Sequence, residues 1–213
     1  MNRADRPTLV VMVKAPVAGA VKSRLAGKVG IAEATRFYRV ATAGLILRLG
    51  RDPRWRTVLA IAPDAALAAP FWPADIARIA QGQGDLGSRM QRLLDRLPPG
   101  PVAIVGSDIP AIGADDIAAA FAALGRADLV FGPAEDGGYW LVGARRRPAV
   151  PRLFGDVRWS GPHALADTLR NAGRRSVAFA ATLADVDTLA DYLAWRKSER
   201  PASLAAGRPS KTG

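Results

Sequence analysis

The chain of 213 residues has no cysteine and one histidine, His163. Without cysteine there can be no disulfide, no thiolate metal site and no cysteine nucleophile. A lone histidine makes a serine–histidine–aspartate triad improbable, and a structural use of His163 at a helix start is favoured. Trp159, just before it, could line a pocket, although a core tryptophan is the safer interpretation.

Long hydrophobic runs are also missing. The apolar run at residues 9–13 is too short to span a bilayer or to form a signal-peptide core. We therefore expect a cytoplasmic protein with no membrane partner. Hydrophobic residues make up 49% of the chain and charged residues 23%, which are the values of a globular domain with a substantial core.

Acidic residues are scarce relative to basic ones. Asp and Glu number 19 against 30 Lys and Arg, which gives a formal net charge of +11. This balance indicates an anionic partner, such as nucleic acid, a membrane surface or a phosphorylated small molecule, or else an arginine-rich proteome. The arginines are spread along the chain without an RNA-binding aromatic signature or finger spacing, so we expect no specific nucleic-acid partner.

Apolar strand-like runs alternate with helical patterns along most of the chain. Strands are predicted at 9–13, 57–61, 76–80, 102–105, 129–131, 139–142 and 176–179, and helices at 32–49, 86–97, 117–124, 164–172 and 188–197. This order predicts a single-domain, three-layer α/β/α fold with a mostly parallel mixed sheet. Two strands meet without a helix between 129 and 142, which predicts one antiparallel strand. We assign residues 1–197 to the domain and 198–213 to a basic, disordered tail.

The loop after the first strand carries three cations, Lys14, Lys22 and Arg24, around Pro16 and Gly19. Loop N–H groups, lysine charges and an arginine fork together suit phosphate groups. The loop matches neither the Walker A pattern nor the dinucleotide glycine pattern. A solvated basic loop is the alternative, and we favour phosphate binding.

A glycine-rich segment opens the helix predicted at 86–97, and helix N-termini favour anions. Gln81 could contact a base or sugar edge. Asp85 is equally suited to cap the helix and to contact a ligand. The predicted nucleotide contacts here are Gln81, Gly84, Asp85 and Arg89.

Asp108 follows a buried strand directly, before Ile109 and Pro110. Packing explains a carboxylate there poorly, whereas Mg²⁺ binds through one or two carboxylates plus substrate phosphates. A turn role for Asp108 is the alternative. Asp185 or Asp187 could add a second metal carboxylate, although Asp187 could equally cap the last helix.

Glu135 and Asp136 precede a glycine pair, Gly137 and Gly138, and then the strand beginning at Tyr139. Glycine allows close approach of the backbone to a ligand or a positive φ angle. The same letters are an ordinary turn signal, so the segment alone is ambiguous.

Together these segments resemble the nucleotide-diphospho-sugar transferase superfamily, which has a GT-A-type fold, over about residues 8–195. They are most similar to a small bacterial subgroup labelled arsenosugar-biosynthesis-type glycosyltransferases. The shared motifs are Lys-x-Pro…Gly…Lys-Ser/Thr-Arg-Leu, Gly-x-Gly-Asp-Leu-Gly-x-Arg-Met, Gly-Ser-Asp-x-Pro and Gly-Pro…Asp-Gly-Gly-Tyr-Trp-Leu. The Lys-Ser-Arg-Leu and Asp-Val-Asp-Thr segments also resemble guanylyltransferases that activate phospholactate-type acids, but those carry Gly-Gly-Thr-Asn where this chain has Gly-Gly-Tyr-Trp.

The resemblance implies a transferase with a divalent cofactor, Mg²⁺ or Mn²⁺, held by Asp108 with Asp187 as a second candidate. It also implies a nucleotide phosphate chain gripped by Lys14, Lys22 and Arg24. The catalytic candidates are Lys22, Asp108 and Asp136, and the acceptor contacts would be Asp136, Gly137, Gly138 and Tyr139. Asp136 would bind the acceptor or take its proton.

Two reactions remain open for a nucleotide or nucleotide-sugar donor and a small acceptor. Glycosyl transfer from a nucleoside-diphosphate sugar ranks first, because the whole-chain resemblance carries that label. Nucleotidyl transfer from a nucleoside triphosphate is the alternative. It is favoured by the lone Asp108, since many glycosyltransferases of this fold hold their metal with an Asp-x-Asp pair.

Overall fold

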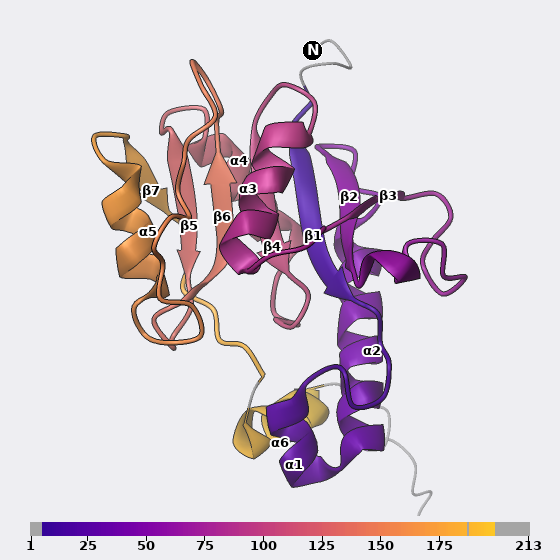
Figure 1. The fold of residues 1–213 in the computed structure, drawn as a ribbon. Coiled ribbons are helices and arrows are strands. Elements are labelled where there is room, and N and C mark those ends of the chain that lie inside the picture. Colours follow the sequence, from indigo (N-terminus) through magenta and orange to yellow (C-terminus); the bar gives the residue numbers. More distant parts are fainter. Residues whose placement is uncertain (1–5, 187, 199–213) are drawn as a thin grey trace, which may run out of the picture.

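The computed structural model describes residues 6–186 and 188–198, which form a seven-stranded sheet covered by helices (Figure 1). The strands lie in the order β3-β2-β1-β4-β6-β5-β7. They are β1 (Thr8–Lys14), β2 (Arg56–Ala62), β3 (Ala77–Ala80), β4 (Val102–Gly106), β5 (Leu129–Pro133), β6 (Tyr139–Ala144) and β7 (Val177–Phe179). The helices are α1 (Ser23–Val29), α2 (Ile31–Leu49), α3 (Leu86–Arg96), α4 (Ala114–Ala123), α5 (Ala164–Ala172) and α6 (Leu189–Ser198).

Only β6 runs against the other strands of this sheet. It pairs antiparallel with β4 and β5, whereas β1–β2, β1–β4, β2–β3 and β5–β7 are parallel pairs. The mixed sheet predicted from the sequence is confirmed. Because β6 is reversed, its first residues lie at the sheet edge where β4 and β5 end, and residues 134–138 connect them there.

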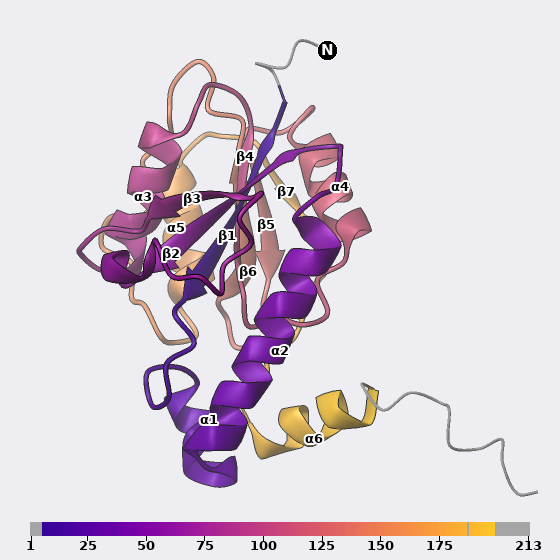
Figure 2. The same cartoon turned by 90° about the vertical axis from the view of Figure 1, so that its right-hand side faces the viewer.

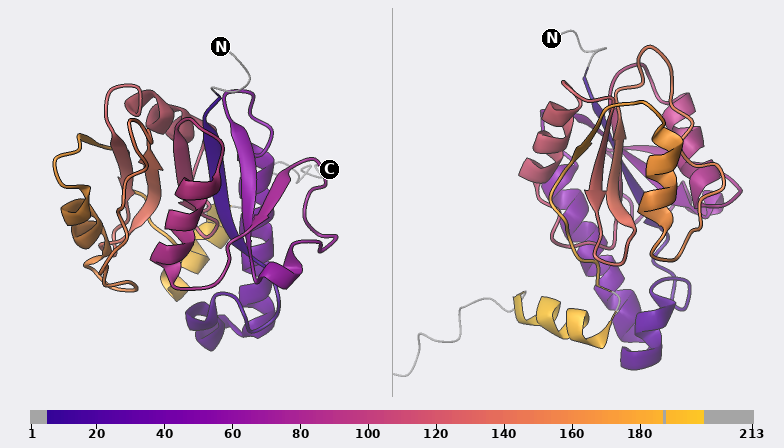
Figure 3. Two further views of the ribbon diagram at one scale, coloured as in Figure 1. Left: turned by 45° about the horizontal axis from the view of Figure 1, so that its top comes forward. Right: turned by 90° about the vertical axis from the view of Figure 1, so that its left-hand side faces the viewer.

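Helices cover both faces of the sheet, as Figures 2 and 3 show: α2 and α4 on one side, α3 and α5 on the other. Side chains alternate between the two faces of a strand, so β1 packs against the helices on both faces of the sheet. Leu9, Val11 and Val13 pack in the cluster with α2 and α4, while Val10 packs in the cluster with α3. The predicted three-layer arrangement is therefore confirmed.

A smaller helical group, α1 with α6 and the start of α2, lies beyond the end of β1 (Figure 1). Phe37 of α2 meets Trp195 of α6 edge-on, with ring centroids 4.7 Å apart. Thr188 opens α6, because its N–H donates to the Asp191 carboxylate at 2.8 Å. The sequence patterns did not predict α1, which is only seven residues long and follows Lys22 in a left-handed conformation. The predicted tail is outside the described residues from 199 onward.

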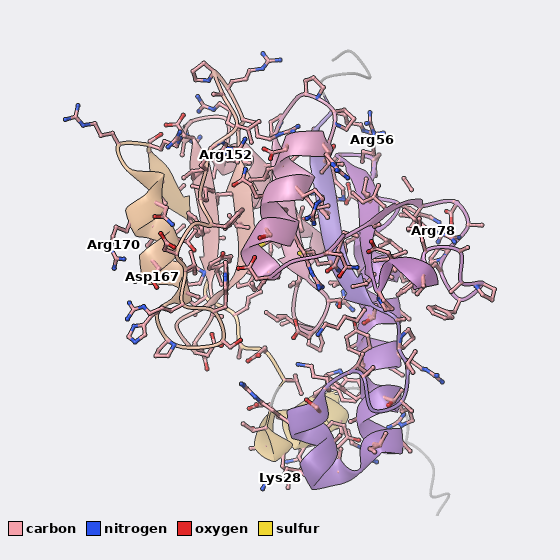
Figure 4. All side chains as sticks on the ribbon, viewed as in Figure 1. Lys28, Arg56, Arg78, Arg152, Asp167 and Arg170 are labelled. Carbon is pink, nitrogen blue, oxygen red and sulfur yellow. The ribbon has the colours of Figure 1, made fainter. Side chains whose placement is uncertain are left out.

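Positive charge is spread over the molecule. The labelled cations of Figure 4 lie on α1, β2, β3, the segment before α5, and α5 itself, and they are Lys28, Arg56, Arg78, Arg152 and Arg170. No helix within the described residues is long and apolar enough to cross a membrane.

Candidate functional site

A polar cleft opens at the sheet edge where β1 and β4 end. It consists of two adjoining cavities of about 550 and about 510 Å³. We call them the α3 half and the α5 half, because the first borders the start of α3 and the second the start of α5. The residues common to both halves are Lys14, Lys22, Leu86, Gly106, Asp108, Tyr139 and Trp140.

Strand register brings the candidate cation and carboxylate together. Met12 of β1 lies beside Gly106 of β4. Two residues further along each strand direction come Lys14 and Asp108. After β1 the chain continues to β2 on one flank of this pair, and after β4 it continues to β5 on the other flank, so the strand order reverses here, at the kind of switch point where α/β proteins bind ligands. Arg24 lines the α5 half of the same cleft.

Lys22 and Asp108 form an ion pair inside the cleft. The Lys22 Nζ lies 3.2 Å from the Asp108 Oδ2, and the two side chains are 6% and 43% exposed. Lys22 has φ 47° and ψ 46°, a conformation that residues other than glycine seldom adopt. The fold thus holds a nearly buried lysine against a carboxylate that remains accessible from the cleft.

Tyr38 ties the ends of β1 and β4 together. Its hydroxyl accepts a hydrogen bond from the Lys14 N–H at 2.8 Å and lies 2.9 Å from the Ser107 Oγ. Burial raises the pKa of Tyr38 above its usual value, so the hydroxyl stays protonated. Both Tyr38 and Ser107 line the α3 half. Sequence reasoning missed Tyr38, because a tyrosine on the core-facing stripe of a helix has no signal that separates it from packing.

Gln81 is buried at the back of the α3 half. Its Nε2 donates to the Val13 and Ala60 carbonyl oxygens at 3.1 and 2.8 Å. Its Oε1 accepts a hydrogen bond from the Arg89 Nη1 at 3.4 Å. With both amide protons engaged by strand carbonyls, Gln81 can offer only its oxygen to a ligand.

Asp85 caps α3, one of the two roles that the sequence left open. Its Oδ1 accepts the Ser88 N–H at 2.8 Å, and hydrogen bonding with Ser88 holds the pKa of Asp85 below its usual value. Arg89 donates from Nε to the Gly84 carbonyl oxygen at 3.0 Å. All three predicted residues, Gly84, Asp85 and Arg89, line the α3 half.

The acidic glycine segment borders the α5 half. Asp136 and Gly138 line this half, and the Asp136 Oδ1 accepts the Gly138 N–H at 2.9 Å. Glu135 is exposed and does not line either half. Gly137 has φ +84°, and a Cβ added there would lie 2.5 Å from the Pro162 carbonyl oxygen. Gly137 therefore serves the close approach of the loop before α5, and it is not among the cleft-lining residues.

The loop before α5 is anchored by a buried carboxylate. Arg158 donates from Nε and Nη2 to Asp167, both at 2.9 Å, and Arg170 lies 3.2 Å from the same carboxylate. Figure 4 shows Asp167 and Arg170 on α5. The hydrogen bonds from Arg158 hold the pKa of Asp167 well below its usual range. His163, next to this helix start, is exposed and does not line the cleft.

Aromatic rings form one wall of the α5 half. Tyr139 and Trp159 meet edge-on with ring centroids 6.5 Å apart. The Tyr139 hydroxyl lies 3.4 Å from the Thr168 Oγ1, and burial raises the pKa of Tyr139. The half-buried Trp159 thus lines the cleft, the less favoured of its two interpretations from sequence.

Carboxylates that could hold a cation are few. Asp108, Asp136 and Asp185 line the α5 half, and Asp187 lies outside the described residues. Within residues 6–186 and 188–198, no three or more His, Cys, Asp or Glu side chains are grouped so that they could hold a metal ion. A metal bound here would need ligands from the substrate as well.

Two predicted phosphate contacts do not line the cleft. Pro16 lies on the opposite side of the loop, where its carbonyl oxygen accepts the Arg39 Nη2 at 3.1 Å. Gly19 has φ +79° and open space where a Cβ would stand. Contacts of Pro16 and Gly19 with a nucleotide stay predictions.

Solved structures share the fold. A provisionally named nucleotide-diphospho-sugar transferase from Desulfovibrio desulfuricans G20 matches with TM-score 0.79 and 27% identity, covering 93% of this chain and 90% of its own. The manganese complex of Rv0371c from Mycobacterium tuberculosis H37Rv matches with TM-score 0.54 and 19% identity, covering 91% and 99%. The inositol-1-phosphate CTP transferase from T. maritima matches with TM-score 0.54 and 12% identity, covering 90% and 93%. The last two likenesses show the fold alone.

Sequence comparison adds a family. No curated protein matches the chain at a significant level. The family model described as "Uncharacterized protein conserved in bacteria (DUF2064)" matches residues 45–161, which include the glycine-rich, Asp108 and Asp136 segments. Because this match spans more than half of the chain, the protein belongs to the DUF2064 family.

Proposed function

We propose that this protein is a metal-dependent transferase that uses a nucleotide-activated donor, and that it moves a glycosyl group from a nucleoside-diphosphate sugar to a small acceptor. One observation carries the proposal: Lys14, Lys22 and Arg24 line the same cleft as Asp108. Three cations suit a diphosphate, and a carboxylate among them suits a bridging cation. The likeness to the Desulfovibrio desulfuricans protein supports sugar transfer, as does the resemblance to arsenosugar-type glycosyltransferases.

Asp108 fits a divalent metal. Its carboxylate is 43% exposed and lies in the α5 half, where donor phosphates would supply the remaining ligands. Oxygen ligands of this kind suit Mg²⁺ and Mn²⁺ alike. Bound there, the cation would neutralise charge on the leaving phosphate. Lys22 would add its charge to the same oxygens, and Lys14 and Arg24 would fix the phosphate chain.

Asp136 stands where the acceptor would enter. One of its oxygens is held by the Gly138 N–H, which fixes the orientation of the carboxylate. In the transfer, an acceptor oxygen attacks the anomeric carbon, and the bond from that carbon to the nucleoside diphosphate breaks with the electron pair leaving on phosphate. Asp136 takes the proton of the acceptor hydroxyl. Tyr139 and Trp159 would pack against the sugar or the acceptor.

Nucleotidyl transfer is the second candidate, and a specific observation favours it. Asp108 is the only acidic residue in the turn at residues 106–110, and its carboxylate is already paired with Lys22. A single carboxylate with three cations suits the greater charge of a triphosphate. In that reaction the acceptor oxygen attacks the α-phosphorus and pyrophosphate leaves.

A ligand screen by thermal shift separates the two reactions. Nucleoside triphosphates and nucleoside-diphosphate sugars are each tested with and without Mg²⁺ or Mn²⁺. Glycosyl transfer predicts metal-dependent stabilisation by nucleoside-diphosphate sugars and release of nucleoside diphosphate in turnover. Stabilisation by triphosphates alone, with pyrophosphate release, would refute sugar transfer in favour of nucleotidyl transfer.

Asp108→Asn tests the metal role. We expect this variant to lose the metal-dependent part of the stabilisation while it still folds. Asp115→Asn is the matched control, because Asp115 is fully exposed on α4, lies outside both halves of the cleft and forms an ion pair with Arg54 at 3.3 Å. If Asp108→Asn kept metal-dependent binding and turnover, the assignment of Asp108 would be wrong.

A further inference from the structure

A second cavity, of about 820 Å³, lies behind the cation-bearing loop. We call it the α2 groove, because α2 forms one wall and the segment before β3 forms another. No residue that lines it lines either half of the cleft. The volume is in the range of small-molecule sites, roughly 300–1,000 Å³.

The α2 groove exposes large apolar side chains to solvent. Leu47 is 71% exposed, Val17 56% and Phe71 53%, and all three line the groove. On α2 the groove-lining positions are 39, 42, 43, 46 and 47, which is the spacing of one helical face. Ile46 of this face also packs in the core with Leu45 and Leu49, so the groove lies at the solvent-facing margin of that core. A concentrated apolar patch of this kind marks a binding surface.

One polar atom in this groove is unsatisfied. Thr42 is 5% exposed, and its Oγ1 is the sole buried side-chain oxygen or nitrogen without a hydrogen-bond partner within the described part of the chain. Because this oxygen is buried from solvent, a ligand in the groove would contact the apolar lining around Thr42 and not its hydroxyl.

The charge at the groove is positive and uncompensated at one end. Arg39 lies one turn before Thr42 on the same face, and it makes no ion pair with any described residue. Arg51 at the other end is already bonded to Asp75 at 2.7 Å. No acidic residue lines the groove. An anion at Arg39 would therefore meet no repulsion from the lining.

We propose that the α2 groove binds a small molecule with an apolar body and one carboxylate end. The apolar body packs against Leu47 and Phe71, and the carboxylate pairs with Arg39. A carboxylate matches the arginine fork. The basic residues 198–213 would place like charges against Arg39, and a second copy docked symmetrically would bring its own Arg39. A small anion is the occupant with complementary charge.

Octanoate is the probe and 1-octanol its neutral match, titrated into the full chain by calorimetry. We expect one octanoate per chain, bound about tenfold more tightly than 1-octanol, since a hydrogen bond to a charged group contributes about that factor. Arg39→Gln should reduce octanoate affinity to that of the alcohol. Arg126→Gln, an exposed arginine far along the chain on another loop, is the control and should change neither.

Three results would overturn the proposal. Octanoate that does not bind, or that binds no more tightly than 1-octanol, removes the anion site. An Arg39→Gln protein that keeps the preference for octanoate removes the role of Arg39. A concentration-dependent dimer that Leu47→Glu abolishes would assign the groove to a second copy. The nucleotide screen on the cleft is unaffected by all three results.

Discussion

Replacing Gly137 by alanine tests whether the acidic glycine segment depends on its contact with the loop before α5. The substitution has two separable costs. Gly137 has φ +84°, which is unfavourable for an L-residue. A Cβ there would also lie 2.5, 2.6 and 2.8 Å from the carbonyl oxygen, Cα and carbonyl carbon of Pro162. These are all backbone atoms, so the loop itself must move.

The two costs can be given magnitudes. The backbone conformation costs alanine about 1 kcal/mol. Forcing an extra carbon into a filled space costs about 1–3 kcal/mol more. Gly137→Ala should therefore lower the free energy of unfolding by about 2–4 kcal/mol, a large part of a typical total of about 5–15 kcal/mol. For a chain of this length the melting temperature would fall by about 5–15 °C.

Two other glycines allow the conformational cost and the steric cost to be measured separately. Gly19 has φ +79° but open space around its Cβ position, so Gly19→Ala should show the conformational cost alone, about 1 kcal/mol. Gly161 has open space and no positive φ, so Gly161→Ala should be neutral. Urea and thermal unfolding measure all three. If Gly137→Ala were no less stable than Gly19→Ala, the close approach to Pro162 would not matter and the reasoning would fail.

Three further outcomes are expected. Hydrogen bonds from Arg36 and from Tyr192 of α6 lower the pKa of Glu33 from 4.5 to about 2. The contribution of the Glu33 carboxylate to the free energy of unfolding is therefore full above pH 4.5 and is lost as the pH falls toward 2. Glu33→Gln should therefore flatten the acid unfolding of α6, followed by tryptophan fluorescence. Thr42→Val should raise the free energy of unfolding by about 1 kcal/mol in urea titrations, because it removes an unsatisfied hydroxyl; a decrease would mean that the hydroxyl has a partner. Asp136→Asn should lower kcat for transfer far more than Glu135→Gln, and equal losses in steady-state assays would contradict the acceptor role.

Much of the fold could be predicted because its signals are local. The run that became β1 is continuously apolar and buried on both faces, and Asp85 stands at a recognisable helix start. The helix α1 could not be predicted in the same way. It has seven residues and one buried side chain, Leu25, so it leaves no periodic apolar pattern. Its position depends on packing with α2, which follows it directly, and with α6, which is distant in sequence.

The cleft could be predicted only in part. Residues that share a strand end, such as Lys14 and Asp108, could be brought together because parallel strands place their carboxyl ends at one edge. Tyr38 could not, because its hydroxyl meets Ser107 through the tertiary packing of α2. Pro16 is a residue that the sequence placed in the cleft and that does not line it. It belongs to the cation-bearing loop, yet the loop turns it toward the α2 groove, and a sequence does not state which face of a loop meets a ligand.

The reversed direction of β6 is what makes the acidic glycine segment part of the cleft. A parallel β6 would need a crossover, and residues 134–138 would then lead away from the edge that carries Asp108. The Trp140 side chain covers Gly132, where an added Cβ would lie 2.3 Å from its ring, and its Nε1 donates to the Ala181 carbonyl oxygen at 2.9 Å. The chain that continues from Ala181 reaches Asp185 in the α5 half. Tyr139 and Trp140 therefore do more than distinguish this chain from the guanylyltransferase pattern: both line the cleft, and Trp140 also holds the segment that brings Asp185 to it.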